Sequence, residues 1–294
     1  MKKKQSNTIL LRSMTIFFVL LAGLFALLAG VKALRYLDSR QAVNLVSPSE
    51  SQRANTTEVA QPPQTAAQPQ SVPSSAALPN QAAPGEKVIY LTFDDGPTAN
   101  TGKIMDALDR CGVKGTFFVV HSYDGCEKQI KEIYDRGHQI ALHTYSHKYE
   151  IYRSQQTYFE DLGKISDLVY NATGYRSMLV RFPGGSSNTI SRKYCSGIMT
   201  ALTNELPRRG YAYFDWNADS MDASGKVVSA EKIVRNSTAY IGKLDQIILL
   251  MHDAKIKTTT ADALPQIIET YTAAGYRFDV LSTQSFTAHH TVNN

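Results

Sequence analysis

The amino-acid sequence predicts an α/β fold in which seven strands, separated by helices, close into a barrel. Two observations support this prediction. From about residue 86, short apolar runs alternate with helix-length segments, which is typical of parallel strand–helix units. In addition, short polar motifs follow several different apolar runs, and a closed barrel brings the ends of many strands to one face. An open doubly wound sheet is the alternative.

The first segment indicates a membrane anchor. Three lysines follow Met1, and residues 13–31 carry no charge, which is enough to span a bilayer as a helix. We expect residues 1–12 to be cytoplasmic and residues 13–34 to form a transmembrane signal-anchor helix, because Lys and Arg precede it. The protein would then be single-pass in the cell membrane, with its catalytic domain extracellular. A cleaved signal peptide, which would make the protein secreted, and a buried core helix are the alternatives.

Residues 35–85 form a segment with the composition of a linker. No aromatic residue lies between Tyr36 and Tyr90, and seven of the eleven prolines fall before residue 86. Such a Pro/Gln/Ala/Ser-rich stretch cannot bury enough apolar surface to fold, so we expect it to be disordered. The folded domain would therefore span residues 86–294.

Within that domain the strands and helices can be placed in order. The expected strands are 88–93, 115–119, 138–143, 178–182, 211–216, 246–251 and 276–280. The expected helices are 102–110, 127–136, 155–173, 193–206, 230–241 and 261–274. Glycines 112, 137, 174, 210 and 275 follow five of these helices, where a helix commonly stops.

Charge excludes one class of function. Residues 1–85 hold 8 Lys/Arg and 3 Asp/Glu, whereas the rest of the chain holds 23 of each. The net charge of +5 thus belongs to the N-terminal region. We expect no nucleic-acid partner, because the folded domain has no excess positive charge. Nothing in the sequence implies a protein partner.

The three cysteines leave two possibilities open. Outside the cell, Cys111 and Cys126 could form a disulfide and leave Cys195 free. Three buried thiols are the alternative. No Cys-x-x-Cys pair is present, so the sequence gives no support to a structural zinc site.

Two adjacent carboxylates end the first expected strand. Asp94 and Asp95 precede a Gly-Pro turn, and neighbouring side chains on a strand point apart. One carboxylate could therefore bind a metal ion while the other acts as a base, although an ordinary surface turn has the same sequence.

Histidines supply further candidate groups. His143 and His147 are spaced i, i+4, so both imidazoles could bind one cation on a helical turn. With a carboxylate they would form a His-His-Asp site, which suits catalytic Zn²⁺ and also non-haem Fe(II). His252 follows an apolar run and could pass a proton to a leaving group, with Leu250 lining an apolar pocket beside it. A core histidine is the alternative for His252.

In order and spacing, these motifs resemble the polysaccharide deacetylase family, the NodB-like carbohydrate esterases of family 4. Within it they are similar to bacterial membrane-anchored peptidoglycan N-acetylglucosamine deacetylases. The resemblance covers about residues 87–286. The motifs that carry it are Thr92-Phe93-Asp94-Asp95-Gly96-Pro97, His143-Thr144-Tyr145-Ser146-His147, Arg181-Phe182-Pro183-Gly184-Gly185 and Leu249-Leu250-Met251-His252-Asp253.

The resemblance implies a distorted seven-stranded (β/α) barrel and a role for each motif residue. Asp94 would be the catalytic base, and Arg181 the arginine that holds it. His252 would be the catalytic acid, with Leu250 in the pocket for the acetyl methyl group. The implied ligands of one divalent metal ion are Asp95, His143 and His147. We expect Zn²⁺ first, with Co²⁺, Ni²⁺ or Mn²⁺ as alternatives.

Two positions depart from the family pattern. Gly184 stands where the family usually has tyrosine; its backbone N–H could still donate to an oxyanion, but the aromatic wall is missing. The family's fourth motif usually ends Asp-Trp, and the best alignment places Asp222 and Ala223 there. Asp222 would then orient His252, with Asp219 as a weaker candidate. The Asp215-Trp216 pair offers another register for this motif.

The implied reaction is metal-dependent removal of N-acetyl groups from amino sugars of cell-wall glycan, most of all N-acetylglucosamine of peptidoglycan. N-acetylmuramic acid, chitin-like oligomers and O-acetylated polysaccharide are alternative substrates. An inactive glycan-binding module is the alternative of another class, and the changes at Gly184 and Ala223 motivate it.

Overall fold

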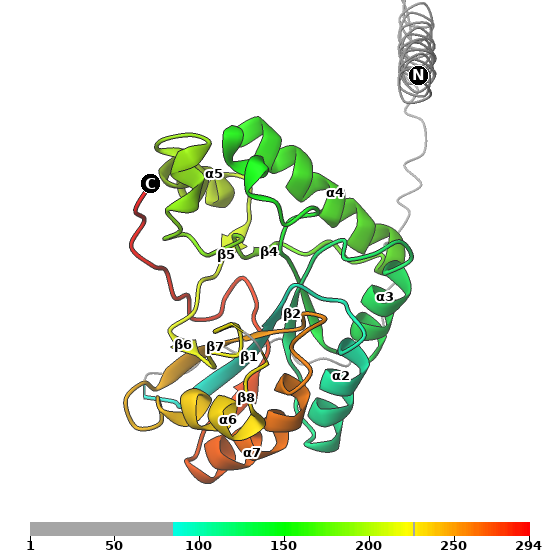
Figure 1. The fold of residues 1–294 in the computed structure, drawn as a ribbon, viewed down its shortest axis with the longest axis vertical. Helices are drawn as coiled ribbons and strands as arrows, with labels where there is room; N and C mark the ends of the chain where they lie inside the picture. Colours follow the sequence, from blue (N-terminus) through cyan, green and yellow to red (C-terminus); the bar gives the residue numbers. More distant parts are fainter. Residues whose placement is uncertain (1–84, 226) are drawn as a thin grey trace, which may run out of the picture. The chain divides into compact units, whose positions relative to one another are not determined.

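The computed structural model describes residues 85–225 and 227–294, and the following account concerns that part of the chain alone (Figure 1). The expected cytoplasmic end, transmembrane helix and linker lie outside the described residues, except for Gly85 at the last linker position. Among the helices that are described, none has the length and apolar character needed to cross a membrane.

A single sheet of parallel strands forms the centre of the domain. Its strands are β1 (Val88–Asp94), β2 (Thr116–Val119), β3 (Gln139–Leu142), β4 (Leu179–Val180), β5 (Ala212–Tyr213), β6 (Ala218–Asp219), β7 (Gln246–His252) and β8 (Arg277–Asp279). The order is β5-β4-β3-β2-β1-β7-β6, and β8 also pairs with β1. Strand β7 pairs with β1 from Val88 to Asp94, whereas β8 pairs with its first half and β2 with its second half. Strand β1 is therefore the axis of the sheet.

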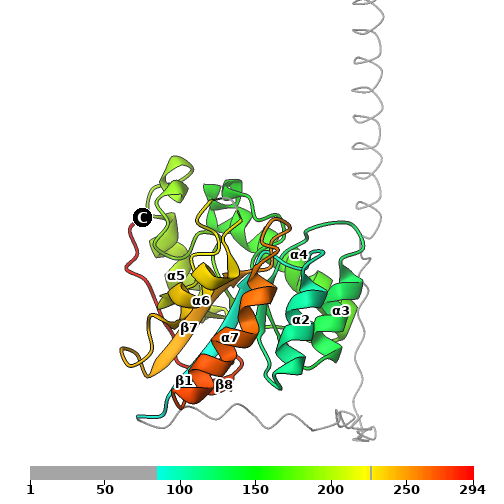
Figure 2. The ribbon, with the colours of Figure 1, turned by 60° about the horizontal axis from the view of Figure 1, so that its bottom comes forward.

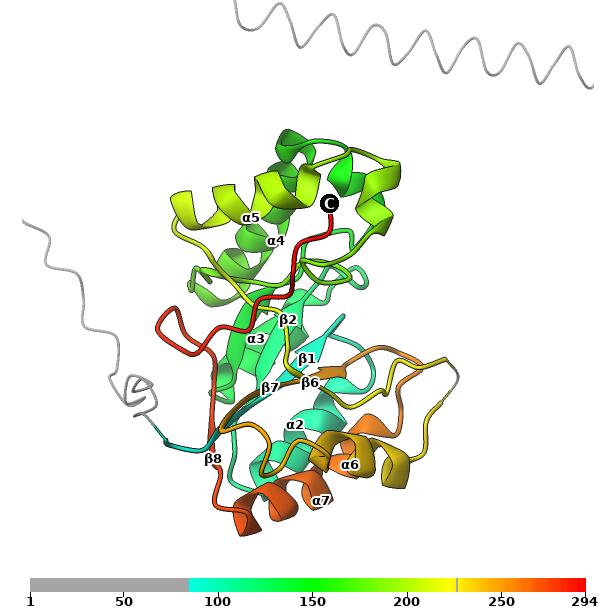
Figure 3. The same cartoon turned by 90° about the vertical axis from the view of Figure 1, so that its left-hand side faces the viewer.

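The seven expected strands are all present, but the sheet is a curled half-barrel. No described pairing joins β5 to β6, the two ends of the strand order. Strands β4, β5 and β6 have only two residues each, too few for long ladders, and β6 was not expected from the sequence. The C-terminal segment lies along this open side (Figure 3), where the N–H of Asp215 donates to the carbonyl oxygen of Ala288 at 2.9 Å. The expected closed barrel is thus confirmed only in its strands and their parallel arrangement.

In the described part of the chain, six α-helices lie around the sheet (Figure 1). They are α2 (Thr101–Arg110), α3 (Glu127–Asp135), α4 (Gln155–Thr173), α5 (Ile198–Arg208), α6 (Ala230–Thr238) and α7 (Thr260–Ala273). Helix α7 packs against α2 and α6 (Figure 2). Two 3₁₀ helices, η1 (Tyr149–Arg153) and η2 (Ile190–Lys193), complete the set. The helix expected at 193–206 begins later, because Gly197 before it has a left-handed φ of 78°.

The alternation of side chains along β1 separates two cores. Ile89, Leu91 and Phe93 belong to the large apolar cluster that also contains the buried faces of the helices. Val88 and Tyr90 belong to a smaller cluster, with Phe118, Leu179, Phe214 and Ile248. Thr92 and Asp94 continue the second series, because side chains two residues apart on a strand share a face. The fold therefore directs Asp94 to the concave face of the sheet.

All three cysteines are free thiols, with Cys126 buried and the other two half-buried.

Candidate metal and catalytic site

Arg181 fixes the position of the Asp94 carboxylate. Both side chains are buried, with Arg181 at 0% and Asp94 at 4% exposure. The Nη1 group of Arg181 donates to Asp94 Oδ1 at 2.7 Å and to the hydroxyl of Thr92 at 2.9 Å. Its Nε and Nη2 groups donate to the carbonyl oxygens of Phe214 and Asp215. All three nitrogens of the guanidinium therefore donate hydrogen bonds, and Asp94 is its one charged partner among the described residues.

This environment keeps Asp94 ionised. Burial alone would raise the pKa of its carboxyl group, but the positive charges of Arg181 and His252 act against burial. The net result is a pKa lowered from the ordinary value. An ionised carboxylate 3.7 Å from the Nε2 atom of His143 is consistent with a base poised beside a cation site.

Asp95, His143 and His147 form the one group of three potential ligands found in the described part of the chain. Asp95 Oδ1 lies 3.6 Å from His143 Nε2 and 3.3 Å from His147 Nε2, and the three ligand atoms lie within 4.8 Å of one another. Asp95, Thr144 and His147 have left-handed φ angles of 75°, 67° and 52°. Non-glycine residues adopt this conformation at a cost, and such strain commonly occurs where side chains must converge.

The donor set fits a divalent metal ion. The Nδ1–H group of His143 donates to the carbonyl oxygen of Arg181 at 2.8 Å, which leaves the Nε2 lone pair facing Asp95. Burial lowers the pKa of His143 most strongly, so the ring is neutral, as a ligand must be. Two neutral imidazoles and a carboxylate are the ligands of an open catalytic zinc site.

Asp161 holds the turn between the two histidines, although no sequence motif includes it. Its Oδ1 atom accepts the N–H groups of Tyr145 at 2.7 Å and Ser146 at 3.0 Å. The residue lies on the buried stripe of α4 that includes Tyr158 and Ile165. A carboxylate at an apolar-face position of a helix was the signal that could have revealed it.

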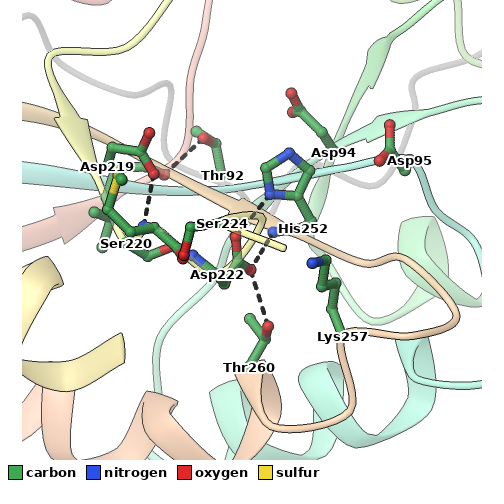
Figure 4. A network of polar contacts seen from close by, with 12 residues as sticks. Thr92, Asp94, Asp95, Asp219, Ser220, Asp222, Ser224, His252, Lys257 and Thr260 are labelled. Carbon is green, nitrogen blue, oxygen red and sulfur yellow. Dashed lines mark hydrogen bonds and ion pairs between the residues drawn. The ribbon is translucent and has the colours of Figure 1, made fainter. Parts of the chain in front are cut away.

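His252 is held by Asp222 on the opposite side of the site. The Nδ1–H group of His252 donates to Asp222 Oδ1 at 2.8 Å, and its backbone N–H donates to Oδ2, also at 2.8 Å. The hydroxyl of Thr260 donates to the same Oδ2 atom at 2.9 Å. Figure 4 shows the carboxylate between His252 and Thr260, while the far side of the imidazole faces Asp94. Asp94 and His252 are also direct register partners in β1 and β7.

The carboxylates around His252 keep its imidazole charged. Burial lowers the pKa of His252, but the hydrogen bond and charge of Asp222, followed by the charges of Asp94 and Asp95, outweigh burial and raise it to about 9. The ring is therefore protonated near neutral pH, which is the form that can give a proton away.

The other two acidic candidates near this motif lie elsewhere. Asp219 accepts the N–H of Met221 at 2.7 Å and makes no described hydrogen bond to His252. Asp215 is fully buried and accepts the N–H groups of Ser186 at 2.8 Å and His290 at 2.9 Å. Of the three registers considered, the geometry therefore favours Asp222 as the residue that orients His252.

Two expected contact positions border the site. Leu250 is two residues before His252 on β7, is 5% exposed and pairs in register with Thr92. Gly184 is exposed, has a φ of 78°, and its N–H has no partner among the described residues. An N–H in this state is free to bind an oxygen of a ligand. Ala223 is exposed and contributes no aromatic surface.

Comparisons with known proteins agree with this arrangement. A family model described as polysaccharide deacetylase matches residues 81–198. YheN of Bacillus subtilis (strain 168), whose name assigns it to the polysaccharide deacetylases, is 31% identical over 202 residues, which cover 67% of this chain and 68% of YheN. A peptidoglycan-N-acetylglucosamine deacetylase of Bacillus cereus is 27% identical and is matched over 68% of this chain and 71% of its own.

A solved structure extends the likeness to the fold. The catalytic domain of peptidoglycan N-acetylglucosamine deacetylase from Eubacterium rectale ATCC 33656 superposes with a TM-score of 0.70 and is 44% identical. The match covers 74% of this chain and 99% of that domain.

Proposed function

Because the chain belongs to the polysaccharide deacetylase family, we propose that it hydrolyses N-acetyl groups on amino sugars of cell-wall glycan. The observation that carries this proposal is a base and an acid facing each other beside a ligand cluster. Asp94 is held ionised by Arg181, and His252 is held protonated by Asp222, on paired positions of neighbouring strands. General acid–base hydrolysis needs this pair of protonation states.

One divalent ion would be held by Asp95, His143 and His147, with Zn²⁺ as first choice and Co²⁺, Ni²⁺ or Mn²⁺ as alternatives. When bound, such an ion polarises the amide carbonyl group and lowers the pKa of water beside it. The remaining steps are assigned to this chain's own side chains and backbone.

Asp94 would take a proton from the water molecule as its oxygen attacks the acetyl carbon. The carbonyl oxygen becomes negative, and the free N–H of Gly184 would donate a hydrogen bond to it. His252 would then give its proton to the amide nitrogen as the C–N bond breaks, so that a neutral amine and acetic acid leave, and the acid ionises to acetate in water. Leu250 would line the pocket for the acetyl methyl group. Its side chain is almost fully buried, with 5% exposure.

Peptidoglycan N-acetylglucosamine is the proposed substrate. The names of the Bacillus cereus relative and of the Eubacterium rectale domain, both peptidoglycan N-acetylglucosamine deacetylases, support it. We further propose that residues 13–34 anchor the protein in the cell membrane with the catalytic domain extracellular, since a basic segment precedes this apolar run.

Acetate release from purified peptidoglycan by the full chain tests the reaction. We expect release that a chelator stops and that Zn²⁺ or Co²⁺ restores. Asp94→Asn should lower kcat about 10³-fold, because a neutral amide cannot accept the proton, while metal binding stays unchanged. Asp167→Asn, an exposed carboxylate on α4, is the matched control. In fractionated cells the activity should accompany the membranes, and should leave them when residues 1–34 are deleted.

Three outcomes would contradict parts of this proposal. Full activity of Asp94→Asn would remove Asp94 as the base. Amines that appear on N-acetylmuramic acid, or acetate released only from an acetyl ester, would change the substrate. A folded protein that binds glycan but releases no acetate with any metal would indicate the inactive binding module.

A further inference from the structure

A tyrosine from another element fills the place of the missing side chain at Gly184. A Cβ atom built on Gly184 would lie 2.6 Å from the hydroxyl oxygen of Tyr149 and 3.4 Å from its Cζ atom. Tyr149 begins η1, two residues after His147. Tyr149 can come this close to the backbone only because residue 184 is glycine. The glycine that departs from the family pattern and the position of Tyr149 therefore depend on each other.

Neighbouring contacts hold the Tyr149 ring in this place. Its centroid lies 5.9 Å from that of Tyr152, which is fully buried. The hydroxyl of Tyr152 donates to the carbonyl oxygen of Pro183 at 2.9 Å. The 3₁₀ helix η1 is therefore fastened to the loop that carries Gly184, and the Tyr149 hydroxyl lies beside that exposed glycine.

The Tyr149 hydroxyl is an unused donor. It has no hydrogen-bond partner among the described residues, and the N–H of Gly184 beside it has none either. A phenol carries its proton at neutral pH, so this group can donate. Two donors without a partner among the described residues thus lie beside each other, and a developing oxyanion is stabilised by donors placed in this way.

We propose that Tyr149 is a further catalytic residue, whose hydroxyl group donates a hydrogen bond to the acetyl carbonyl oxygen together with the N–H of Gly184. This inference rests on the proposed deacetylase function. The ring supplies the aromatic wall that position 184 lacks, and the hydroxyl adds a second protein donor to the oxyanion. A donor of this kind binds the transition state more tightly than the substrate, so its loss lowers kcat and leaves KM in place.

The substitution Tyr149→Phe removes the hydroxyl group and keeps the aromatic ring, so it tests the hydroxyl alone. In the full-length protein with its metal, we expect kcat for an N-acetylglucosamine tetramer to fall about 10²-fold, with KM unchanged. Calorimetric binding of the same tetramer to Asp94→Asn, with and without Tyr149→Phe, should give equal Kd values. Tyr170→Phe, which removes an exposed hydroxyl on α4, is the matched control and should change nothing.

The outcomes divide clearly. Unchanged kcat in Tyr149→Phe, or an unchanged kcat with a raised KM and Kd, would overturn the role of Tyr149 and leave the deacetylase standing. Absence of acetate release from the wild-type protein would overturn the proposed function, and the role of Tyr149 with it.

A double-mutant cycle tests the geometry without activity. Gly184→Ala should lower the Tm, since its Cβ atom would meet the Tyr149 hydroxyl. In the Tyr149→Phe background the closest remaining atom is the Cβ of Asn188 at 3.2 Å, so the same substitution should lower the Tm less. Equal decreases in both backgrounds would show that the hydroxyl does not occupy this place, and would overturn the proposal.

Discussion

At the scale of single residues, the proposed chemistry depends on protonation states set by immediate neighbours. Asp222 contacts His252 through both oxygens, one on the ring and one on the backbone. The first contact stabilises the imidazolium, and the second fixes the residue that carries it. An amide of the same shape lacks the charge and has one acceptor oxygen in place of two, so Asp222→Asn should weaken the hold on the imidazolium.

Asp222→Asn should move the alkaline limb of the pH profile to lower pH. The Asp222 carboxylate is the strongest of the influences that raise the pKa of His252 to about 9, whereas burial lowers it. Without that carboxylate the pKa falls, and the imidazolium is lost as pH rises through a lower value. kcat/KM of the variant should therefore decline at lower pH than in the wild type, with a larger deficit at pH 8 than at pH 6.

The pH dependence of kcat/KM, measured from pH 5 to 10, checks this shift. Asp219→Asn is the control, because Asp219 ends β6 only three residues before Asp222 and makes no described hydrogen bond to His252. An alkaline limb that stays in place in Asp222→Asn would mean that another group sets this pKa.

The site residues that the sequence predicts lie in short motifs. Those that it does not predict act through contacts with residues far away in the sequence. Asp94, Asp95, His143 and His147 were readable because each motif is a short stretch with its own spacing. Asp161 and Thr260 were missed because their partners are 15 to 38 residues away and only folding brings them together. Tyr149 was missed because its place depends on a side chain that Gly184 lacks.

At the scale of elements, the turn from β3 to η1 carries both histidine ligands. This turn has left-handed residues at Thr144 and His147, so its backbone needs support from outside. Asp161 on α4 supplies that support by accepting two of the turn's N–H groups.

Asp161→Ala should weaken metal binding without removing a ligand. The N–H groups of Tyr145 and Ser146 lose their acceptor, and His147 loses its fixed orientation toward Asp95. We expect the Kd for Zn²⁺ to rise about 10- to 100-fold, as for other residues that orient metal ligands. Competition with a chromophoric chelator measures this Kd. Asp167→Ala, six residues later on the same helix and exposed, should leave it unchanged; an equal Kd in Asp161→Ala would contradict the supporting role.

Long elements were more predictable than short ones. The limits of α4 follow from the sequence, because Ser154 caps it and Gly174 ends it in a left-handed conformation. Strand β6 has only two residues, which is too short to show the alternating pattern of a strand in the sequence. It forms because it pairs with β7. Closure of the barrel could not be predicted from the sequence either. It depends on whether β5 and β6, the two-residue strands at the ends of the strand order, pair with each other.

At the scale of the whole domain, the open side of the half-barrel is covered by segments distant in sequence. Asp215 follows β5, the loop around Ser186 follows β4, and residues 288–290 come from the C-terminal segment (Figure 3). The Asp215 carboxylate accepts the N–H and hydroxyl of Ser186 and the N–H of His290. One buried side chain therefore joins three segments where strand pairing is absent among the described residues.

Asp215→Ala should consequently destabilise the domain more than an ordinary polar substitution. The N–H groups of Ser186 and His290 would lose their acceptor, at about 1–3 kcal/mol each, and the Ser186 hydroxyl would keep only a 3.5 Å contact with the carbonyl oxygen of His290. A loss of about 3 kcal/mol or more in the free energy of unfolding would lower the Tm by roughly 6–12 °C for a domain of this size. Calorimetric unfolding of the full chain measures the change, with the exposed Asp245→Ala as control.

Because the carbonyl oxygen of Asp215 also accepts from Arg181, any accompanying loss of activity would reach Asp94 through that guanidinium. A Tm within about 2 °C of the wild-type value would instead mean that the C-terminal segment is held by other contacts.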